Sequence, residues 1–308
     1  MPKLSFQYVS GPHGPETLVQ FLERRFPYHT AEEWRSLIAD GHVTVNGKRV
    51  PPGFALRTRH KIVYERPPFA EPEIDPRFSV LYEDEVLLAV DKSGNIPTSP
   101  SGKYWNHCLV QVVQRELALS RLHACHRLDR ETSGVILLAK TGQAARILGE
   151  DFAAGRVAKE YVAVLRGALA GRETYVSVPL AADPASSIRI KQAATPGGRE
   201  SRTRFTLLAR LPGSSLVRVE TLTGRTHQIR AHAALLGHPV WGDKLYGRPE
   251  AEFIEWVQSG PRNAEERHLL HASSLRFNHP TTGETLTVAS SARPLVELLI
   301  QQAPRPRL

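Results

Sequence analysis

The stretch CHRLDRETSGVILLAK, residues 125–140, places a carboxylate between two guanidinium groups. Asp129 has Arg127 two residues before it and Arg130 directly after it, and a Thr-Ser-Gly turn and an apolar run follow. Nearby positive charge favours the ionised form of a carboxyl group, so Asp129 is expected to stay charged. An ionised, partly desolvated aspartate can act as a nucleophile or a base. The same residues also suit a structural ion pair that caps a turn, so residue types alone leave both interpretations open.

The segment HRLDRETSGVILLAK resembles the signature of the RluA family of RNA pseudouridine synthases. Three further stretches match this family in order and spacing. RVAKEYVAVLRG, residues 156–167, is similar to its Lys-x-Tyr strand, and LTGRTHQIRAHAALLGHPVWGDKLYG, residues 222–247, to its Gly-Arg-x-His-Gln-Ile-Arg helix and the turns that follow. LHASSLRFNHP, residues 270–280, is similar to its C-terminal strand. After DKSGNIP the chain departs from the family pattern, with Thr98-Ser99-Pro100 where Val-His-Pro is common.

This resemblance implies isomerisation of a uridine that is already part of an RNA chain. The N-glycosidic bond breaks, the uracil turns while it is held, and C5 bonds to C1′. Asp129 is implied as the essential carboxylate, either attacking C1′ or removing a 2′ proton. Tyr161 is implied to stack on the uracil and to assist deprotonation of C5, and Arg230 to pair with Asp129. By residue type alone, Tyr161 is a half-buried strand aromatic and Arg230 an exposed helix arginine.

The target nucleotide must leave its stack, because a stacked base hides its C1′ chemistry. Arg127 would project beside the site, and its planar cation could fill the vacated stack. A contact with phosphate or with backbone is the alternative. Arg130, the second arginine beside Asp129, is expected to contact RNA.

A domain of strands and helices over residues 79–302 must position these side chains. The pattern has neither an internal repeat nor a strict strand–helix alternation, which favours an α+β fold with a mixed, largely antiparallel sheet. Strands are expected at 80–82, 86–90, 135–139, 161–165, 204–208, 216–220 and 286–289, and helices at 107–117, 144–152, 226–236 and 295–301.

Residues 13–66 are expected to form a small separate domain. Helices are predicted from Glu16 and from Thr30, the second ended by Gly41, and strands at 42–45, 48–50 and 62–64 around an Asn-Gly turn. The segment LIADGHVTVNGKRV resembles the S4 domain, which binds structured RNA, and this implies Arg35, Lys48 and Arg49 as RNA contacts. A degenerate S4 fold kept only as a packing appendage is the alternative. The four prolines of residues 67–78 predict a stiff, extended linker.

The net charge of +9 favours a polyanionic partner, with RNA preferred over a membrane. Residues 186–230 contain nine arginines and lysines and two glutamates. A basic loop in this segment, made flexible by glycine, is expected to bind the phosphate backbone of RNA. Solvated loop charge is the alternative interpretation. The residues expected to contact RNA in this region are Arg202, Arg204 and Arg225. Ribosomal RNA is favoured over transfer RNA as the structured substrate.

Other function classes lack their signatures. Two cysteines, Cys108 and Cys125, form neither a disulfide framework nor a zinc site, and a reducing cytoplasm is expected. His227 and His232 lie five residues apart and do not share a helix face, so no metal is expected. No apolar run is long enough for a membrane span, and no glycine-rich phosphate loop indicates a nucleotide cofactor. A monomer is the default. A non-catalytic RNA-binding protein and a nuclease are the competing functions, although a metal-dependent nuclease would need a second carboxylate near Asp129.

Overall fold

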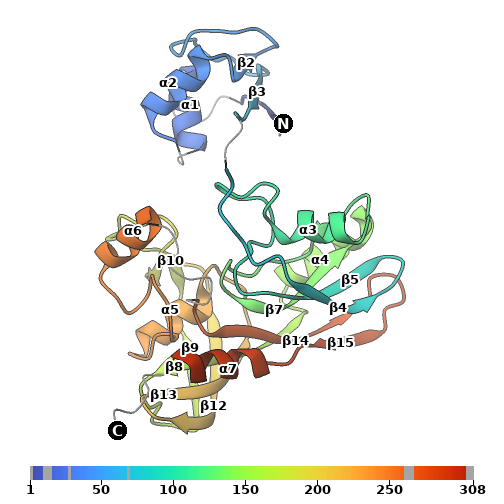
Figure 1. Ribbon diagram of the computed structural model, residues 1–308, viewed down its shortest axis with the longest axis vertical. Coiled ribbons are helices and arrows are strands. Elements are labelled where there is room, and N and C mark those ends of the chain that lie inside the picture. Colours follow the sequence, from blue (N-terminus) through green and yellow to red (C-terminus); the bar gives the residue numbers. More distant parts are fainter. Residues whose placement is uncertain (1–2, 10–15, 27–28, 68–69, 260–266, 303–308) are drawn as a thin grey trace. The chain divides into compact units, whose positions relative to one another are not determined.

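The computed structural model divides the chain into two compact units, residues 1–72 and 73–308, which we describe separately (Figure 1). It describes residues 3–9, 16–26, 29–67, 70–259 and 267–302. Residues 13–15 at the start of the expected first domain, 13–66, lie outside the described residues. The same holds for residues 68 and 69 of the expected linker, 67–78.

The first unit packs two helices against a three-stranded antiparallel sheet of order β1-β3-β2. Thr30 begins the second helix as predicted, because its hydroxyl accepts from the backbone N–H of Glu33 while the Glu33 carboxylate accepts from the backbone of Thr30. Trp34 and Ile38 of that helix are buried in the core of the unit. The elements are β1 (Lys3–Gln7), α1 (Leu18–Arg25), α2 (Ala31–Ala39), β2 (Val43–Val45) and β3 (Lys61–Glu65).

Two features of this unit differ from expectation. The strand β1 precedes the expected domain start and pairs with β3. The prediction of a return strand at 48–50 was wrong. Only Lys48 forms a bridge to Val45, and β2 pairs with β3 instead. Pro51 and Pro52 follow directly, and proline has no N–H to donate to a strand ladder, so the chain leaves the sheet after Lys48.

The second unit is built on a ten-stranded mixed sheet, as the α+β prediction required. Most of its pairings are antiparallel. A separate ribbon pairs β10 (Leu180–Ala182) with β11 (Gln192–Ala194). In sheet order the strands are β4 (Phe78–Glu83), β5 (Leu87–Lys92), β7 (Ser133–Ala139), β14 (Leu270–Asn278), β8 (Ala158–Arg166), β13 (Ser214–Thr221), β12 (Arg202–Leu211) and β9 (Glu173–Ser177), with β15 (Thr285–Ala289) beside β14 and β6 (His123–Ala124) beside β7.

One late strand, β14, joins the two halves of the sheet (Figure 1). It runs antiparallel to β8 and pairs in parallel with β7 over only two residues, where His271 faces Ser133 and Ala272 faces Gly134. Gly134 has φ +110°, and a Cβ there would lie 2.2 Å from the carbonyl oxygen of Ala272. The two strands can therefore approach this closely only with glycine at 134.

Helices cover both faces of each half of the sheet. On β7, Ile136 and Leu138 pack with α3 (Leu109–Glu116), whereas Val135 and Leu137 pack with α4 (Gly142–Ala153). On the other half, α5 (Gln228–Leu235) and α7 (Arg293–Gln302) pack against different hydrophobic clusters that share β8. The sequence did not predict α6 (Glu250–Ser259). Among the described residues, no helix is both long enough and apolar enough to span a membrane.

Candidate active site

One pocket of the second unit is lined by all three residues that the sequence singled out for catalysis. Asp129 comes from the loop before β7, Tyr161 from β8 and Arg230 from the first turns of α5. The strands β7 and β8 flank β14, so the sheet brings together residues that are far apart in the sequence. Leu128 and Leu270 add apolar side chains to the wall of this pocket.

The backbone of the Asp129 loop is fixed by two buried side chains. The Thr98 hydroxyl lies 3.1 Å from both the carbonyl oxygen and the backbone nitrogen of Leu128. The Lys92 ammonium donates to the carbonyl of Arg130 at 3.0 Å and to two carbonyls of residues 93–96 at 2.8 Å. Burial lowers the pKa of Lys92 to about 7. Thr98 belongs to the segment that departs from the family pattern, and here it anchors the Asp129 loop.

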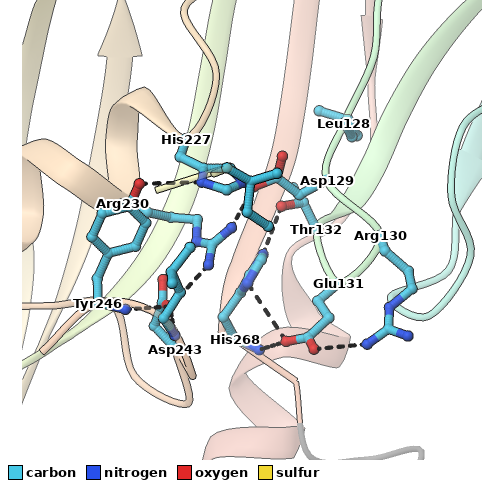
Figure 2. Close-up of polar contacts among 12 residues, drawn as sticks. Leu128, Asp129, Arg130, Glu131, Thr132, His227, Arg230, Asp243, Tyr246 and His268 are labelled. Carbon is cyan, nitrogen blue, oxygen red and sulfur yellow. Dashed lines mark hydrogen bonds and ion pairs between the residues drawn. The ribbon is translucent and has the colours of Figure 1, made fainter. Parts of the chain in front are cut away.

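Arg230 bridges two carboxylates (Figure 2). Its Nη1 donates to Oδ2 of Asp129 at 2.8 Å, while Nε and Nη2 donate to Asp243 at 2.6 and 2.9 Å. The Asp243 side chain is 0% exposed and also accepts from the backbone N–H groups of Leu245 and Tyr246. Arg230 is therefore held from its buried side and presents its remaining nitrogen to Asp129, which rules out the exposed helix arginine of the alternative interpretation.

The electrostatics keep Asp129 ionised although only 21% of its side chain is exposed. Burial raises the pKa of this carboxyl group. The charge of Arg230, the electrostatic interaction with His227, the hydrogen bond from Arg230 and the charge of Arg127 together outweigh burial, so the pKa of Asp129 lies below its ordinary value. For Tyr161, burial and the negative charge of Asp129 raise the pKa of the phenol to about 12. The site at neutral pH therefore holds an anionic Asp129 and a neutral Tyr161.

Three residues that contact the Asp129–Arg230 pair were not predicted from the sequence: His227, Asp243 and Tyr246. His227 was weighed only as a metal ligand, yet its Nε2 lies 3.9 Å from Oδ2 of Asp129 and its Nδ1 lies 3.1 Å from the Tyr246 hydroxyl. His227 has φ +52°, and α5 begins at Gln228 rather than at residue 226. Their position in the sequence could have indicated two of them. His227 lies in the same motif as Arg230, and the Gly-Asp turn that contains Asp243 ends the same stretch.

The basic residues expected to contact RNA separate into two groups in this unit. Arg127 and Arg225 line the pocket with Asp129, and Nε of Arg225 donates to the Glu200 carbonyl at 2.9 Å. Arg130 points away from the pocket (Figure 2); it donates to the Tyr104 hydroxyl and lies over the Trp256 ring at 5.2 Å. Two others form surface ion pairs instead, Arg202 with Glu200 at 3.1 Å and Arg204 with Glu173 and Glu220 at 3.7 and 3.5 Å.

In the first unit, Arg35, Lys48 and Arg49 are exposed. Arg49 lies across Gly41, where a Cβ would approach its guanidinium carbon to 2.3 Å. All three cations are accessible to a ligand of the isolated unit. Within the described part of the chain, no group of three or more His, Cys, Asp or Glu side chains could hold a metal ion.

Two family models match this chain, and known proteins are similar to it over most of its length. The sequence model of the family described as RNA pseudouridylate synthase matches residues 86–235, and that of the S4 domain matches residues 16–62. An uncharacterized RNA pseudouridine synthase of Synechocystis is 30% identical over 277 residues, covering 90% of this chain and 94% of the relative. The ribosomal large subunit pseudouridine synthase C of Salmonella typhimurium is 33% identical over 269 residues, with 82% of each chain covered. The chain belongs to the RluA family of RNA pseudouridine synthases.

A solved structure and a further sequence relative agree with this family membership. The human RNA pseudouridylate synthase domain containing 1 is 26% identical, with a TM-score of 0.57, and the match covers 77% of this synthase and 100% of that chain. The tRNA pseudouridine(32) synthase of yeast mitochondria is 31% identical over 235 residues, which cover 76% of this chain and 51% of that protein. The synthase is thus an RNA-directed isomerase with a separate S4 domain.

Proposed function

We propose that this synthase converts uridine to pseudouridine in structured RNA with Asp129 as its essential carboxylate, and that ribosomal RNA is its substrate in preference to transfer RNA. The observation that carries the proposal is the Arg230–Asp129 contact at 2.8 Å in a pocket that Tyr161 also lines. A charged, aimed carboxylate is what either opening step requires.

The arrangement leaves one oxygen of Asp129 available for the reaction. Oδ2 is bound by Arg230, whereas Oδ1 makes no hydrogen bond within the described residues. Attack by this oxygen on C1′, or removal of the 2′ proton by it, would break the N-glycosidic bond. After attack, C1′ is held as an ester of Asp129, and C5 of the turned uracil displaces the carboxylate as it bonds to C1′. After removal of the 2′ proton, the sugar carries a C1′=C2′ double bond, and C5 adds to C1′ while the proton returns to C2′. On either route N1 takes up a proton and the proton on C5 leaves to solvent.

Tyr161 and Arg127 have supporting roles in this proposal. Tyr161 stacks on the uracil and assists removal of the C5 proton through its hydroxyl. Its pKa of about 12 means that the phenol is neutral when uracil binds, so it can assist only as a hydrogen-bonding group or through water. Arg127 is exposed at the pocket and is placed to occupy the gap that the flipped nucleotide leaves.

The choice of ribosomal RNA rests on the relatives that this synthase resembles. Relatives from Haemophilus, Pasteurella and Salmonella are named ribosomal large subunit pseudouridine synthase C, and they are matched over most of their length, unlike the tRNA enzyme.

Exposed cations on the S4 unit and the arginines at the pocket would contact phosphate. The contacts we propose are Arg127, Arg225, Arg35, Lys48 and Arg49, with Arg130, Arg202 and Arg204 contributing only if RNA displaces their present partners.

The test is Asp129→Asn, expressed in cells that lack the gene. The amide nearly matches the carboxylate in size but is no nucleophile, so pseudouridine at the target should disappear while RNA affinity stays within about twofold. Chemical mapping of pseudouridine in total RNA measures the first quantity and identifies the RNA class. Asp151→Asn, which alters an ion pair on α4, is the matched control. Normal modification by Asp129→Asn would exclude the assigned role.

A further inference from the structure

We propose that His227 is a positioning residue that donates a hydrogen bond from Nε2–H to Oδ2 of Asp129, with its tautomer set by Tyr246. This inference rests on the proposed role of Asp129. It assigns a task to a side chain that lines the pocket and whose ring nitrogens face Asp129 on one side and Tyr246 on the other (Figure 2).

The hydrogen-bond partners of the Tyr246 hydroxyl support this tautomer of His227. Its oxygen accepts from the backbone N–H of Gln192 at 2.9 Å. The single hydroxyl proton then has one other partner among the described residues, Nδ1 of His227 at 3.1 Å. Donation of that proton to Nδ1 gives the buried hydroxyl an acceptor, and a neutral ring then carries its own hydrogen on Nε2, the nitrogen that faces Asp129.

The surroundings keep this ring neutral. The His227 side chain is 8% exposed. Burial first, and then the charge of Arg230, lower its pKa to about 4, although Asp129 and Asp243 act in the opposite direction and Arg127 adds to the lowering. A neutral donor can orient a carboxylate without adding a second full positive charge beside Arg230. A second cation would stabilise the Asp129 anion further and make it a weaker nucleophile and base, so a neutral donor preserves its reactivity.

The strained backbone conformation of His227 indicates that the surrounding structure fixes the direction of its ring. His227 adopts φ +52° and ψ +19°. This left-handed conformation is unfavourable for any residue that has a β-carbon. The separation of 3.9 Å is longer than a hydrogen bond. Such contacts are commonly long in the free enzyme and shorten when substrate is bound. We expect this one to close by about 1 Å on RNA.

Two substitutions separate the donor role from a purely structural one. In His227→Gln the side-chain amide nitrogen reaches the position of Nε2, whereas in His227→Asn it reaches only that of Nδ1. Asparagine, however, tolerates left-handed backbone better than glutamine. A donor role therefore predicts that Gln retains most of the rate and that Asn loses about tenfold to a hundredfold. A backbone role predicts the opposite order.

The measurement uses the full-length enzyme and total RNA from cells that lack the gene, labelled with tritium at C5 of uridine. Release of tritium under single-turnover conditions reports the bond exchange, and RNA affinity and the melting temperature are measured in parallel. A rate for His227→Gln equal to or below that of a folded His227→Asn would overturn the proposal. If His227→Asn does not fold, Tyr246→Phe decides: a severalfold slower rate is expected, and an unchanged rate would reject the proposal.

Failure of the underlying assignment would look different. If wild-type enzyme released tritium and Asp129→Asn did so equally well, then the proposed role of Asp129 would fail whatever the variants of His227 do. If Asp129→Asn releases tritium more slowly than wild type while both variants of His227 release it at the wild-type rate, then the role of Asp129 stands and that of His227 is refuted.

Discussion

Arg230 directs most of its hydrogen bonds to a carboxylate that faces away from the pocket. Asp243 binds two of its nitrogens and is itself buried and bound by two backbone N–H groups. This second carboxylate holds the guanidinium in one orientation and offsets its desolvation. Asp243 thus orients Arg230, and Arg230 in turn orients Asp129. Single substitutions should therefore affect the charge and the geometry of this site in separable ways.

Arg230→Lys should retain only a small part of the rate, because an ammonium cannot contact both carboxylates with the geometry of a guanidinium. The pKa of Asp129 is lowered in the native protein chiefly by Arg230 acting against burial. Weakening that contact raises this pKa, so the acid limb of the pH–rate profile should move to higher pH. Arg218→Lys, on the surface beside Glu160, is the control. A profile that does not move would show that another group keeps Asp129 charged.

Arg230→Ala should also reduce stability, by about 3–5 kcal/mol, because it leaves Asp243 buried without its cation. The sign with pH follows from the lowered pKa of Asp243, for which burial is outweighed by Arg230. A carboxyl group with a lowered native pKa stabilises the fold above its unfolded pKa and loses that contribution as pH falls through the native value. The stability difference between variant and wild type should therefore shrink in acid, as denaturant titrations at several pH values can measure.

At the scale of elements, the contact between β7 and β14 determines whether the pocket forms. Gly134 has φ +110°, and a Cβ there would meet the backbone of Ala272. Gly134→Ala should therefore cost about 2–4 kcal/mol and lower activity as well, since Asp129 lies only five residues earlier. Gly149→Ala, in the middle of α4 with open space around it, should leave stability unchanged or slightly higher. Equal melting temperatures for the two variants would contradict this account.

Sequence patterns predicted the elements that carry periodicity and the residues that carry a motif. The strands β5 and β7 and the helices α3 and α4 lie where apolar spacing placed them, and Asp129, Tyr161 and Arg230 share one pocket. The ribbon β10–β11 and the strand β9 were missed, because short strands give too little alternation to detect. His227 and Asp243 were missed for a different reason: their partners are tertiary, so no local spacing shows them.

At the scale of the whole molecule, the charge of the first unit should appear as salt dependence. Replacing the exposed Arg35, Lys48 and Arg49 by alanine should weaken RNA binding and reduce the slope of log affinity against log salt by about 0.7–0.9 for each phosphate that the variant no longer neutralises. The control replaces three exposed arginines of the second unit that already form ion pairs, Arg146, Arg156 and Arg293. If both triple variants lower the slope equally, then the S4 unit makes no specific contact with RNA.

The place of β14 in the sheet has a consequence for synthesis of the protein. The strand is made only at residues 270–278, yet it lies between β7 and β8, which carry or adjoin Asp129 and Tyr161. A nascent chain that ends before residue 270 has both of these strands but nothing to bridge them. The ribosome must therefore release nearly all of the second unit from its exit tunnel before the pocket can close. We therefore expect a growing chain to lack the assembled pocket until its synthesis is nearly finished.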